Sequence, residues 1–217
     1  MTVYRLHCFS QSGNSYKVAF LLRALGQAYE SVFVDFMRGM TRDAAWRETT
    51  NEMGEAPVLE DGPGRLTQSG VILTHLAKKH GKFGGKTPEE EQEILRWILF
   101  DNHKFTSYFA TYRFMRAFGP TAPDPAVLAF LKTRIDGAYA IVDRHLAASP
   151  FIVGNAPTIA DFSLCGYLYY PVEESDYDVR SRFPRIAAWL ERVKEIPGWA
   201  LPYDILPGER IAPRWLA

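Results

Sequence analysis

A short polar loop separates two apolar segments near the start of the chain: Phe9-Ser10-Gln11-Ser12-Gly13-Asn14-Ser15-Tyr16-Lys17-Val18. Before it, Val3, Leu6 and Cys8 belong to an alternating apolar run that predicts a strand. After it, the run from Tyr16 to Leu25 has helical periodicity. A loop that ends at a helix N-terminus directs several backbone N–H donors and the positive end of the helix dipole toward one point. The stretch therefore predicts an anion site.

The loop alone does not select the anion, which can be a phosphate, a carboxylate or a thiolate. It lacks the glycine patterns of nucleotide-binding loops. Ser12 and Asn14 offer short side-chain donors at its entrance, which suits one small, soft anion. The alternative is that Ser12, Asn14 or Ser15 only caps the helix.

Composition indicates an ordinary globular protein. Apolar residues make up 47% and charged residues 23% of the 217 positions, and 25 basic residues balance 25 acidic ones. A neutral chain gives no electrostatic case for nucleic acid or an anionic membrane surface. Apolar runs such as Val18 to Leu22 are too short to span a bilayer, and no signal peptide is recognised, so we expect a cytoplasmic protein. Cys8 and Cys165 lack metal-ligand spacing, so we expect buried thiols and no metal.

The first third of the chain mixes strands and helices. Tyr29 to Phe36 predicts a second strand, and Thr41 to Thr50 a short helix capped by Thr41. The segment Met53 to Gly62 enters a strand through Pro57, and Arg65 to Gln68 predicts the returning strand. This order of elements is typical of an α/β layer arrangement.

Two short segments in this part of the chain, Ala56-Pro57 and Gln68-Ser69, are candidate ligand contacts. A cis bond before Pro57 would turn the Ala56 backbone outward to pair with an extended ligand, whereas base rates favour an ordinary trans proline. Gln68 and Ser69 precede the helical run with Val71, Ile72 and Leu76. Ser69 is either the N-cap of this helix or a donor to a carboxylate at the helix N-terminus.

The rest of the chain has helical patterns. Gly81 to Pro88 has the glycine, lysine and proline content of an interdomain linker. Helices are predicted beyond it at Glu89 to Phe118, Asp124 to Leu146, Thr158 toward Tyr170, and Phe183 to Glu195. The third opens with a capping-box pattern from Thr158 to Asp161.

Taken together, these stretches resemble the cytosolic glutathione transferase superfamily over almost the whole chain. The similar features are the loop from Ser12 to Val18, the loop from Asn51 to Leu59, the Gln68-Ser69 pair, the linker and the capping box. The resemblance implies a thioredoxin-like α/β domain over residues 1–81 and an all-α helical-bundle domain over residues 88–217. It also implies a cis Pro57, a homodimer, and glutathione as co-substrate.

The resemblance assigns roles to individual positions. Ser12 corresponds to the serine that contacts the glutathione sulfur in serine-type classes, and Asn14 to the asparagine of nu-type relatives. The remaining glutathione contacts implied are the Ala56 backbone beside Pro57 for the cysteinyl unit, Gln68 and Ser69 for the γ-glutamyl end, and Glu55 and Arg42 near the glycyl carboxylate. Because an acid would repel that carboxylate, we expect Glu55 to contribute its backbone or to point away, and Arg42 to be the cation.

The implied reaction is attack of the glutathione thiolate on a small hydrophobic electrophile, held in a pocket walled by the helical domain. Candidates for the wall are Phe105, Tyr108, Tyr112 and Trp215, each of which can equally be a core residue. A glutathione-dependent disulfide reductase or peroxidase is the second possibility, supported by Asn14. A non-catalytic, glutathione-transferase-like binding subunit is the third, and it would be expected to lack the residues around the sulfur.

Overall fold

Four strands form one mixed sheet at the N-terminal end of the molecule. The computed structural model describes residues 3–215, and the outermost residues of the two predicted domains, 1–2 and 216–217, lie outside this range. The strands are β1 (Tyr4–Cys8), β2 (Tyr29–Phe33), β3 (Val58–Asp61) and β4 (Gly64–Thr67), in the order β2-β1-β3-β4. β1 is parallel to β2 and antiparallel to β3, and β3 and β4 form a hairpin.

Helices make up most of the remaining structure. The α-helices are α1 (Gly13–Ala24), α2 (Ala44–Thr49), α3 (Ser69–His80), α4 (Pro88–Phe100), α5 (Thr106–Ala117), α6 (Pro125–His145), α7 (Ile159–Leu164), α8 (Val179–Arg182), α9 (Pro184–Lys194) and α10 (Pro202–Ile205). A π-helical turn, Asp101–Phe105, joins α4 to α5, and short 3-10 turns cover Met40–Arg42, Cys165–Tyr167 and Val172–Glu174. No helix in the described part of the chain is long and apolar enough to cross a membrane.

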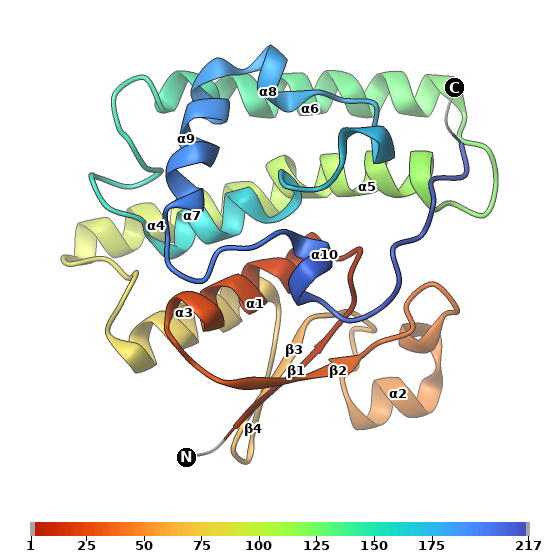
Figure 1. Ribbon diagram of the computed structural model, residues 1–217, viewed down its shortest axis with the longest axis horizontal. Helices are drawn as coiled ribbons and strands as arrows, with labels where there is room; N and C mark the ends of the chain where they lie inside the picture. The colour runs from red at the N-terminus through yellow and green to blue at the C-terminus, as the bar shows by residue number, and fades with distance from the viewer. Residues whose placement is uncertain (1–2, 216–217) are drawn as a thin grey trace.

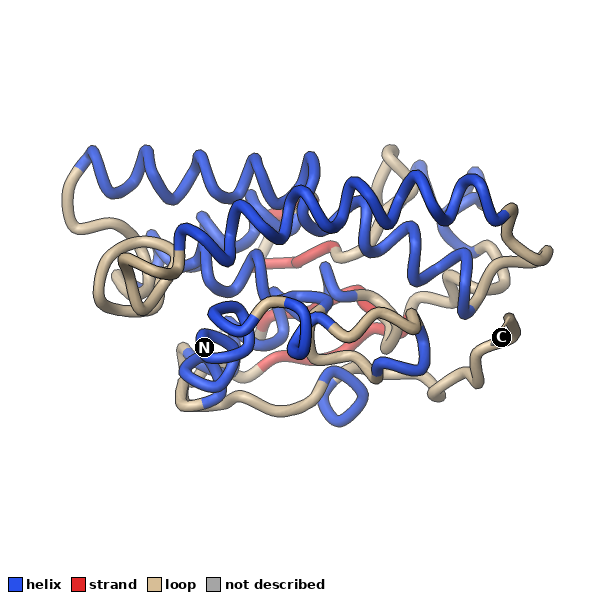
Figure 2. Tube along the Cα trace, turned by 90° about the horizontal axis from the view of Figure 1, so that it is seen from above, coloured by secondary structure: helices blue, strands red, loops and turns tan. Residues whose placement is uncertain are grey.

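The sheet is covered on both faces. Leu6, Cys8 and Leu59 face the main core with α1 and α3, whereas Val58 packs with Trp46 of α2 on the other face. Figure 1 shows α1 and α3 between the sheet and the upper helices α5 and α6, and Figure 2 shows the strands flanked by helices on both sides. The predicted fold class, a thioredoxin-like domain followed by a helical bundle, is confirmed.

Four helical features differ from the sequence expectation for local reasons. α1 begins at Gly13, earlier than expected, because Ser12 caps it. α2 begins at Ala44, since the Asp43 carboxylate, and not Thr41, accepts from the first N–H groups. The predicted helix from Glu89 to Phe118 is one helical path interrupted by the π turn. Ser69 is the first residue of α3 and Gln68 occupies its N-cap position, so Ser69 is not the N-cap.

Other local expectations are confirmed. Thr158 and Asp161 form the capping box of α7. The bond between Ala56 and Pro57 is cis. Cys8 and Cys165 are free, buried thiols, and burial raises the pKa of both.

Acidification is expected to weaken the pairing of β1 with β3. His7 donates to Glu60 at 2.9 Å, and this hydrogen bond holds the pKa of the Glu60 carboxyl below its usual range. A lowered carboxyl pKa stabilises the fold above the unfolded-state pKa, and this stabilisation is lost as pH falls through the folded-state pKa. Between about pH 6 and pH 3.5, the free energy of unfolding in urea is expected to fall by about 0.5 kcal/mol more in wild type than in Glu60→Gln. Equal losses in the two proteins would contradict this.

Candidate functional site

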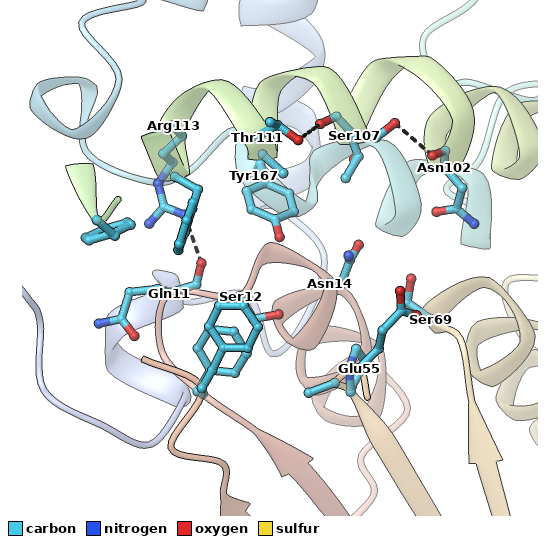
Figure 3. Close-up of a pocket in the computed structure, with 18 of the residues that line it drawn as sticks. Gln11, Ser12, Asn14, Glu55, Ser69, Asn102, Ser107, Thr111, Arg113 and Tyr167 are labelled. Carbon is cyan, nitrogen blue, oxygen red and sulfur yellow. Dashed lines mark hydrogen bonds between the residues drawn. The ribbon is translucent and has the colours of Figure 1, made fainter. Parts of the chain in front are cut away.

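A cleft of about 500 Å³ lies between the loops above the sheet and helix α5. Figure 3 shows Ser12, Asn14, Glu55 and Ser69 on one side, and Arg113 and residues of α5 on the other. The lining residues from the sheet side are Phe9, Gln11, Ser12, Asn14, Phe36, Met37, Gly54, Glu55, Ala56, Pro57, Gln68 and Ser69. Those from the helical side are Asn102, Thr106, Ser107, Ala110, Thr111, Arg113, Phe114, Phe118 and Tyr167.

Ser12 both caps α1 and faces the cleft. Its Oγ accepts the N–H of Ser15 at 3.0 Å, and the residue is 3% exposed. A serine hydroxyl has two lone pairs and one proton. Capping occupies one lone pair, so the proton remains available to an anion in the cleft. The capping and ligand-binding interpretations are therefore compatible.

Asn14 lies in the first turn of α1 and also lines the cleft. Its Oδ1 atom is buried, with no hydrogen-bond partner within the described part of the chain. Buried polar atoms are nearly always paired. Because this orphaned oxygen is an acceptor, it is expected to pair with a donor on a bound ligand, while the Nδ2 amide group is the part of Asn14 that can donate to a thiolate.

The opposite end of the cleft is the N-terminus of α3. Ser69 begins this helix and is 6% exposed, and Gln68 before it has a φ of 64°. Gln68 Nε2 donates to Glu55 Oε2 at 2.7 Å. The helix N-terminus suits a carboxylate, while the Glu55 carboxylate supplies a negative charge nearby.

Arg113 is a buried cation behind the loop that carries Ser12. Its side chain is 3% exposed and pairs with the fully buried Glu174. Nε donates to Glu174 Oε2 at 2.8 Å, and Nη1 donates to the carbonyl of Gln11 at 2.8 Å. The guanidinium also lies 3.8 Å from the centre of the Tyr170 ring. Its charge is balanced, so it anchors the loop and does not act as a free anion receptor.

Comparison with known proteins places this site in a family. Residues 4–78 match the glutathione S-transferase N-terminal domain and residues 125–192 the glutathione S-transferase C-terminal domain. The crystal structure of a glutathione S-transferase from Pseudomonas fluorescens is 30% identical, with a TM-score of 0.84 over 93% of this chain and 99% of that one. The chain belongs to the glutathione S-transferase family.

Two curated relatives show the range of similar proteins. Glutathione S-transferase F14 of Arabidopsis thaliana is 26% identical over 205 residues, which cover 90% of this chain and 80% of that protein. Elongation factor 1-gamma 3 of Oryza sativa is 26% identical over 168 residues, which cover 76% of this chain and 40% of that protein. The relatives of this chain thus include proteins named as transferases and a protein named as an elongation factor subunit.

The structure brings together most of the positions to which the family resemblance assigned glutathione contacts. Ser12, Asn14, Glu55, Ala56, Pro57, Gln68 and Ser69 all line the one cleft. Arg42 does not: it is exposed in the 3-10 turn Met40–Arg42 before α2. Among the described residues of the lining, Arg113 is the cation, and Glu174 already pairs with it. Arg42 therefore lies outside the lining of this cleft, and its contact with the glycyl carboxylate stays a prediction.

The predicted aromatic wall also needs correction. Phe105 and Tyr112 are buried in the core at 1% and 4% exposure, and Phe105 stacks on Tyr139 of α6 with ring centres 4.2 Å apart. Tyr108 packs partly buried against the same core, and Trp215 Nε1 donates to the Gly119 carbonyl. The large apolar side chains cover the contact with α6, which leaves the adjacent face of α5 for the cleft.

That adjacent face carries small and polar side chains, which the sequence interpretation missed. Thr106, Ser107, Ala110 and Thr111 face the cleft, and Phe114 closes its end. A weak signal was present, because these residues recur at helical spacing beside the aromatic stripe. Tyr167, which lines the cleft from a separate 3-10 turn, had no local signal.

Proposed function

We propose that this chain is a glutathione S-transferase that activates the thiol of glutathione for attack on small electrophiles. The carrying observation is the Ser12 hydroxyl, which caps α1 through a lone pair and keeps its proton for the cleft. Asn14 and the N-terminal N–H groups of α1 lie around the same position.

These groups can supply the free energy that is needed to lower the pKa of the bound thiol. A free thiol has a pKa of about 8.5 and is only a few per cent thiolate at neutral pH. Lowering that pKa by about two units requires roughly 2.7 kcal/mol of preferential thiolate stabilisation. One hydroxyl hydrogen bond, one amide and a helix dipole together supply energy of this order.

The rest of glutathione is assigned to the sheet side of the cleft. The Ala56 backbone pairs with the cysteinyl unit, and Gln68 and Ser69 hold the γ-glutamyl carboxylate at the N-terminus of α3. Glu55 accepts a hydrogen bond from Gln68, so its negative charge lies at the proposed γ-glutamyl end of the site, where that unit also carries an ammonium group. With Arg42 outside the lining, the glycyl carboxylate has no assigned cation within this chain's described cleft residues.

Conjugation is a simple displacement. The thiol proton leaves to solvent, the sulfur forms a bond to an electrophilic carbon, and the leaving group departs with its bonding electrons. Phe36, Phe114 and Phe118 provide an apolar surface for the electrophile, and Ser107 and Thr111 provide hydroxyls beside it. Partly polar electrophiles fit this lining better than purely apolar ones.

Disulfide reduction is the second candidate, favoured by the polar face of α5. There the thiolate attacks one sulfur of a disulfide and releases the other as a thiolate, and a second glutathione resolves the mixed disulfide. Asn102 and Ser107 would offer hydrogen-bonding groups to a polar disulfide. Parallel assays with chlorodinitrobenzene and hydroxyethyl disulfide distinguish the two reactions by which substrate is turned over.

Glutathione binding by calorimetry is the first experiment, followed by ultraviolet difference absorbance of the bound thiolate between about pH 5 and pH 9. Binding with a thiolate pKa well below that of free glutathione supports an enzyme. Binding without that shift supports the non-catalytic alternative. Absence of binding overturns the proposed function.

Ser12→Ala is expected to lower kcat/KM near pH 6.5 by about 10- to 100-fold, because the thiolate loses a preorganised donor. The same change removes the N-cap of α1, at about 1 kcal/mol of stability. Steady-state kinetics and urea unfolding measure the two effects separately.

Ser12→Asp separates capping from catalysis. Aspartate is a good N-cap, so stability is expected to stay near that of wild type. Its negative charge repels a thiolate, so activity is expected to fall at least as far as in Ser12→Ala. If Ser12→Ala and Asn14→Ala both keep wild-type turnover and pH profile, the assigned sulfur contact is wrong.

The homodimer and the cytoplasmic location stay predictions. Exposed apolar side chains do lie on α3 and α4, where Val71, Leu95 and Leu99 are 53%, 53% and 60% exposed. We infer that this face supports pairing of two copies, which sedimentation of the purified protein checks.

A further inference from the structure

Tyr167 brings a phenol hydroxyl from the helical part of the chain to the beginning of α1. It ends the 3-10 turn Cys165–Tyr167 and lines the cleft. Its ring lies directly on Gly13, because a Cβ added there would be 2.2 to 2.5 Å from three ring carbons. Only a glycine permits so close an approach. The ring and the Ser12 loop are therefore fitted to each other.

The same residues hold the ring and the loop. Tyr170 packs against Tyr167 with ring centres 5.9 Å apart, and its own hydroxyl donates to the Ser10 carbonyl at 2.7 Å. Arg113 lies 5.8 Å from the Tyr167 ring centre and donates to the Gln11 carbonyl. Because these anchors are shared, the phenol has a defined position relative to the start of α1.

The hydroxyl of Tyr167 points toward the position assigned to the glutathione sulfur. Figure 3 shows it directed at the space between Ser12 and Asn14. Burial raises the pKa of Tyr167, although the Arg113 charge, the N–H groups of Asn14 and Gly13 and the Ser12 hydroxyl act in the opposite direction. The phenol oxygen therefore lies close to the donors at the helix N-terminus. With a raised pKa, it keeps its proton at neutral pH.

We propose that Tyr167 donates a hydrogen bond to the glutathione sulfur, so that the thiolate is held between the hydroxyls of Ser12 and Tyr167. This inference rests on the proposed function and adds a catalytic residue to it. A tyrosine hydroxyl has one proton to donate and accepts through its lone pairs. The N–H groups of Gly13 and Asn14 lie on the acceptor side of this oxygen, where they lower its pKa, so the phenol proton is free to be donated to the sulfur.

Other charged groups around this position come from separate elements. Arg113 on α5 lies behind Tyr167, with its charge balanced by Glu174, and Glu55 lies across the cleft. None of them is changed by removing the phenol oxygen. Tyr167→Phe therefore tests the hydroxyl alone and keeps the ring that covers Gly13.

The experiment measures the pKa of bound glutathione, the Kd of glutathione and kcat in wild type, Tyr167→Phe and a control. Tyr29→Phe is the matched control, since Tyr29 begins β2 and does not line the cleft. In Tyr167→Phe the bound thiol pKa is expected to rise by about one unit. Kd is expected to stay unchanged near pH 5 and to weaken up to about tenfold near pH 8, where wild type binds the thiolate.

The kinetic signature follows from the same shift. kcat near pH 6 is expected to fall about tenfold and to approach the wild-type value at a pH above both thiol pKa values. A purely structural role would lower kcat equally at every pH or alter thermal stability. If Tyr167→Phe keeps the wild-type thiol pKa while Ser12→Ala raises it, this inference fails and the proposed function stands. If wild type shows no lowered thiol pKa, both fail.

Discussion

Lys17→Met is expected to lower the free energy of unfolding by about 3–5 kcal/mol, because it leaves a buried carboxylate without its counter-charge. Lys17 Nζ lies 2.6 Å from Asp101 Oδ2, and both side chains are 0% exposed. For a chain of this length the change corresponds to a melting temperature lower by roughly 10 °C. Urea and thermal unfolding measure it.

The surroundings of Asp101 explain why the effect is large. Ser163 donates to Asp101 Oδ2 at 2.6 Å, and Thr106 donates to Oδ1. Asp101 begins the π turn, so the pair joins α1 to the junction of α4 and α5. Gly166 leaves room for the lysine chain, since a Cβ there would lie 2.6 Å from Lys17 Cε. An uncompensated charge at this place has no route to solvent.

A double variant separates lost charge balance from lost packing. Lys17→Met combined with Asp101→Asn removes both charges and keeps an amide for Thr106 and Ser163, so at least half of the lost stability is expected to return. Lys194→Met is the surface control: Lys194 donates to Glu191 at 2.9 Å, with the lysine side chain partly exposed and the glutamate side chain exposed. Its expected effect is below about 0.5 kcal/mol. A similar loss in Lys17→Met and Lys194→Met would contradict the argument.

Local signals were sufficient to predict the fold class. The capping box at Thr158 and Asp161, the turn at Gly62 and the helical periods are properties of neighbouring residues, and all appear in the structure. Boundaries were less accurate, because Thr41 and Asp43 are both acceptable caps and only the tertiary context selects Asp43. Inexact helix boundaries do not change the predicted fold class, because the order of strands and helices is enough to define the α/β layers and the helical bundle.

Only the part of the site that is formed by loops leading into helices could be predicted from the sequence. Ser12, Asn14, Gln68 and Ser69 stand at helix starts, and helix starts can be read from sequence. The cleft face of α5 could not be predicted, because periodicity identifies an aromatic stripe but not the neighbour that it contacts. Phe105 faces α6, and the side chains beside it face the cleft.

Arg113→Met is expected to be the second severely destabilising change, again by about 3–5 kcal/mol. It leaves Glu174, which is fully buried, with the Tyr203 hydroxyl at 2.8 Å and the more distant Arg210 guanidinium at 3.6 Å, and removes the only guanidinium among the described residues that hydrogen-bonds to it directly. It also removes the hydrogen bond to the Gln11 carbonyl, next to Ser12. Activity is therefore expected to fall along with stability, and urea unfolding and steady-state kinetics report each effect.

The double variant Arg113→Met with Glu174→Gln distinguishes these two roles. Removing both charges is expected to restore most of the stability, because no unpaired carboxylate remains. It does not restore the anchor on the Gln11 carbonyl. The loop is then held by Tyr170 at the Ser10 carbonyl and by the hydrogen bonds of the Ser10 and Gln11 side chains to the Glu209 carbonyl. A stable double variant with kcat/KM still about tenfold below wild type would locate the function of Arg113 in positioning the loop. Full recovery of both stability and activity would mean that Arg113 and Glu174 only neutralise each other's buried charge. The loop would then keep its geometry without the hydrogen bond from Arg113.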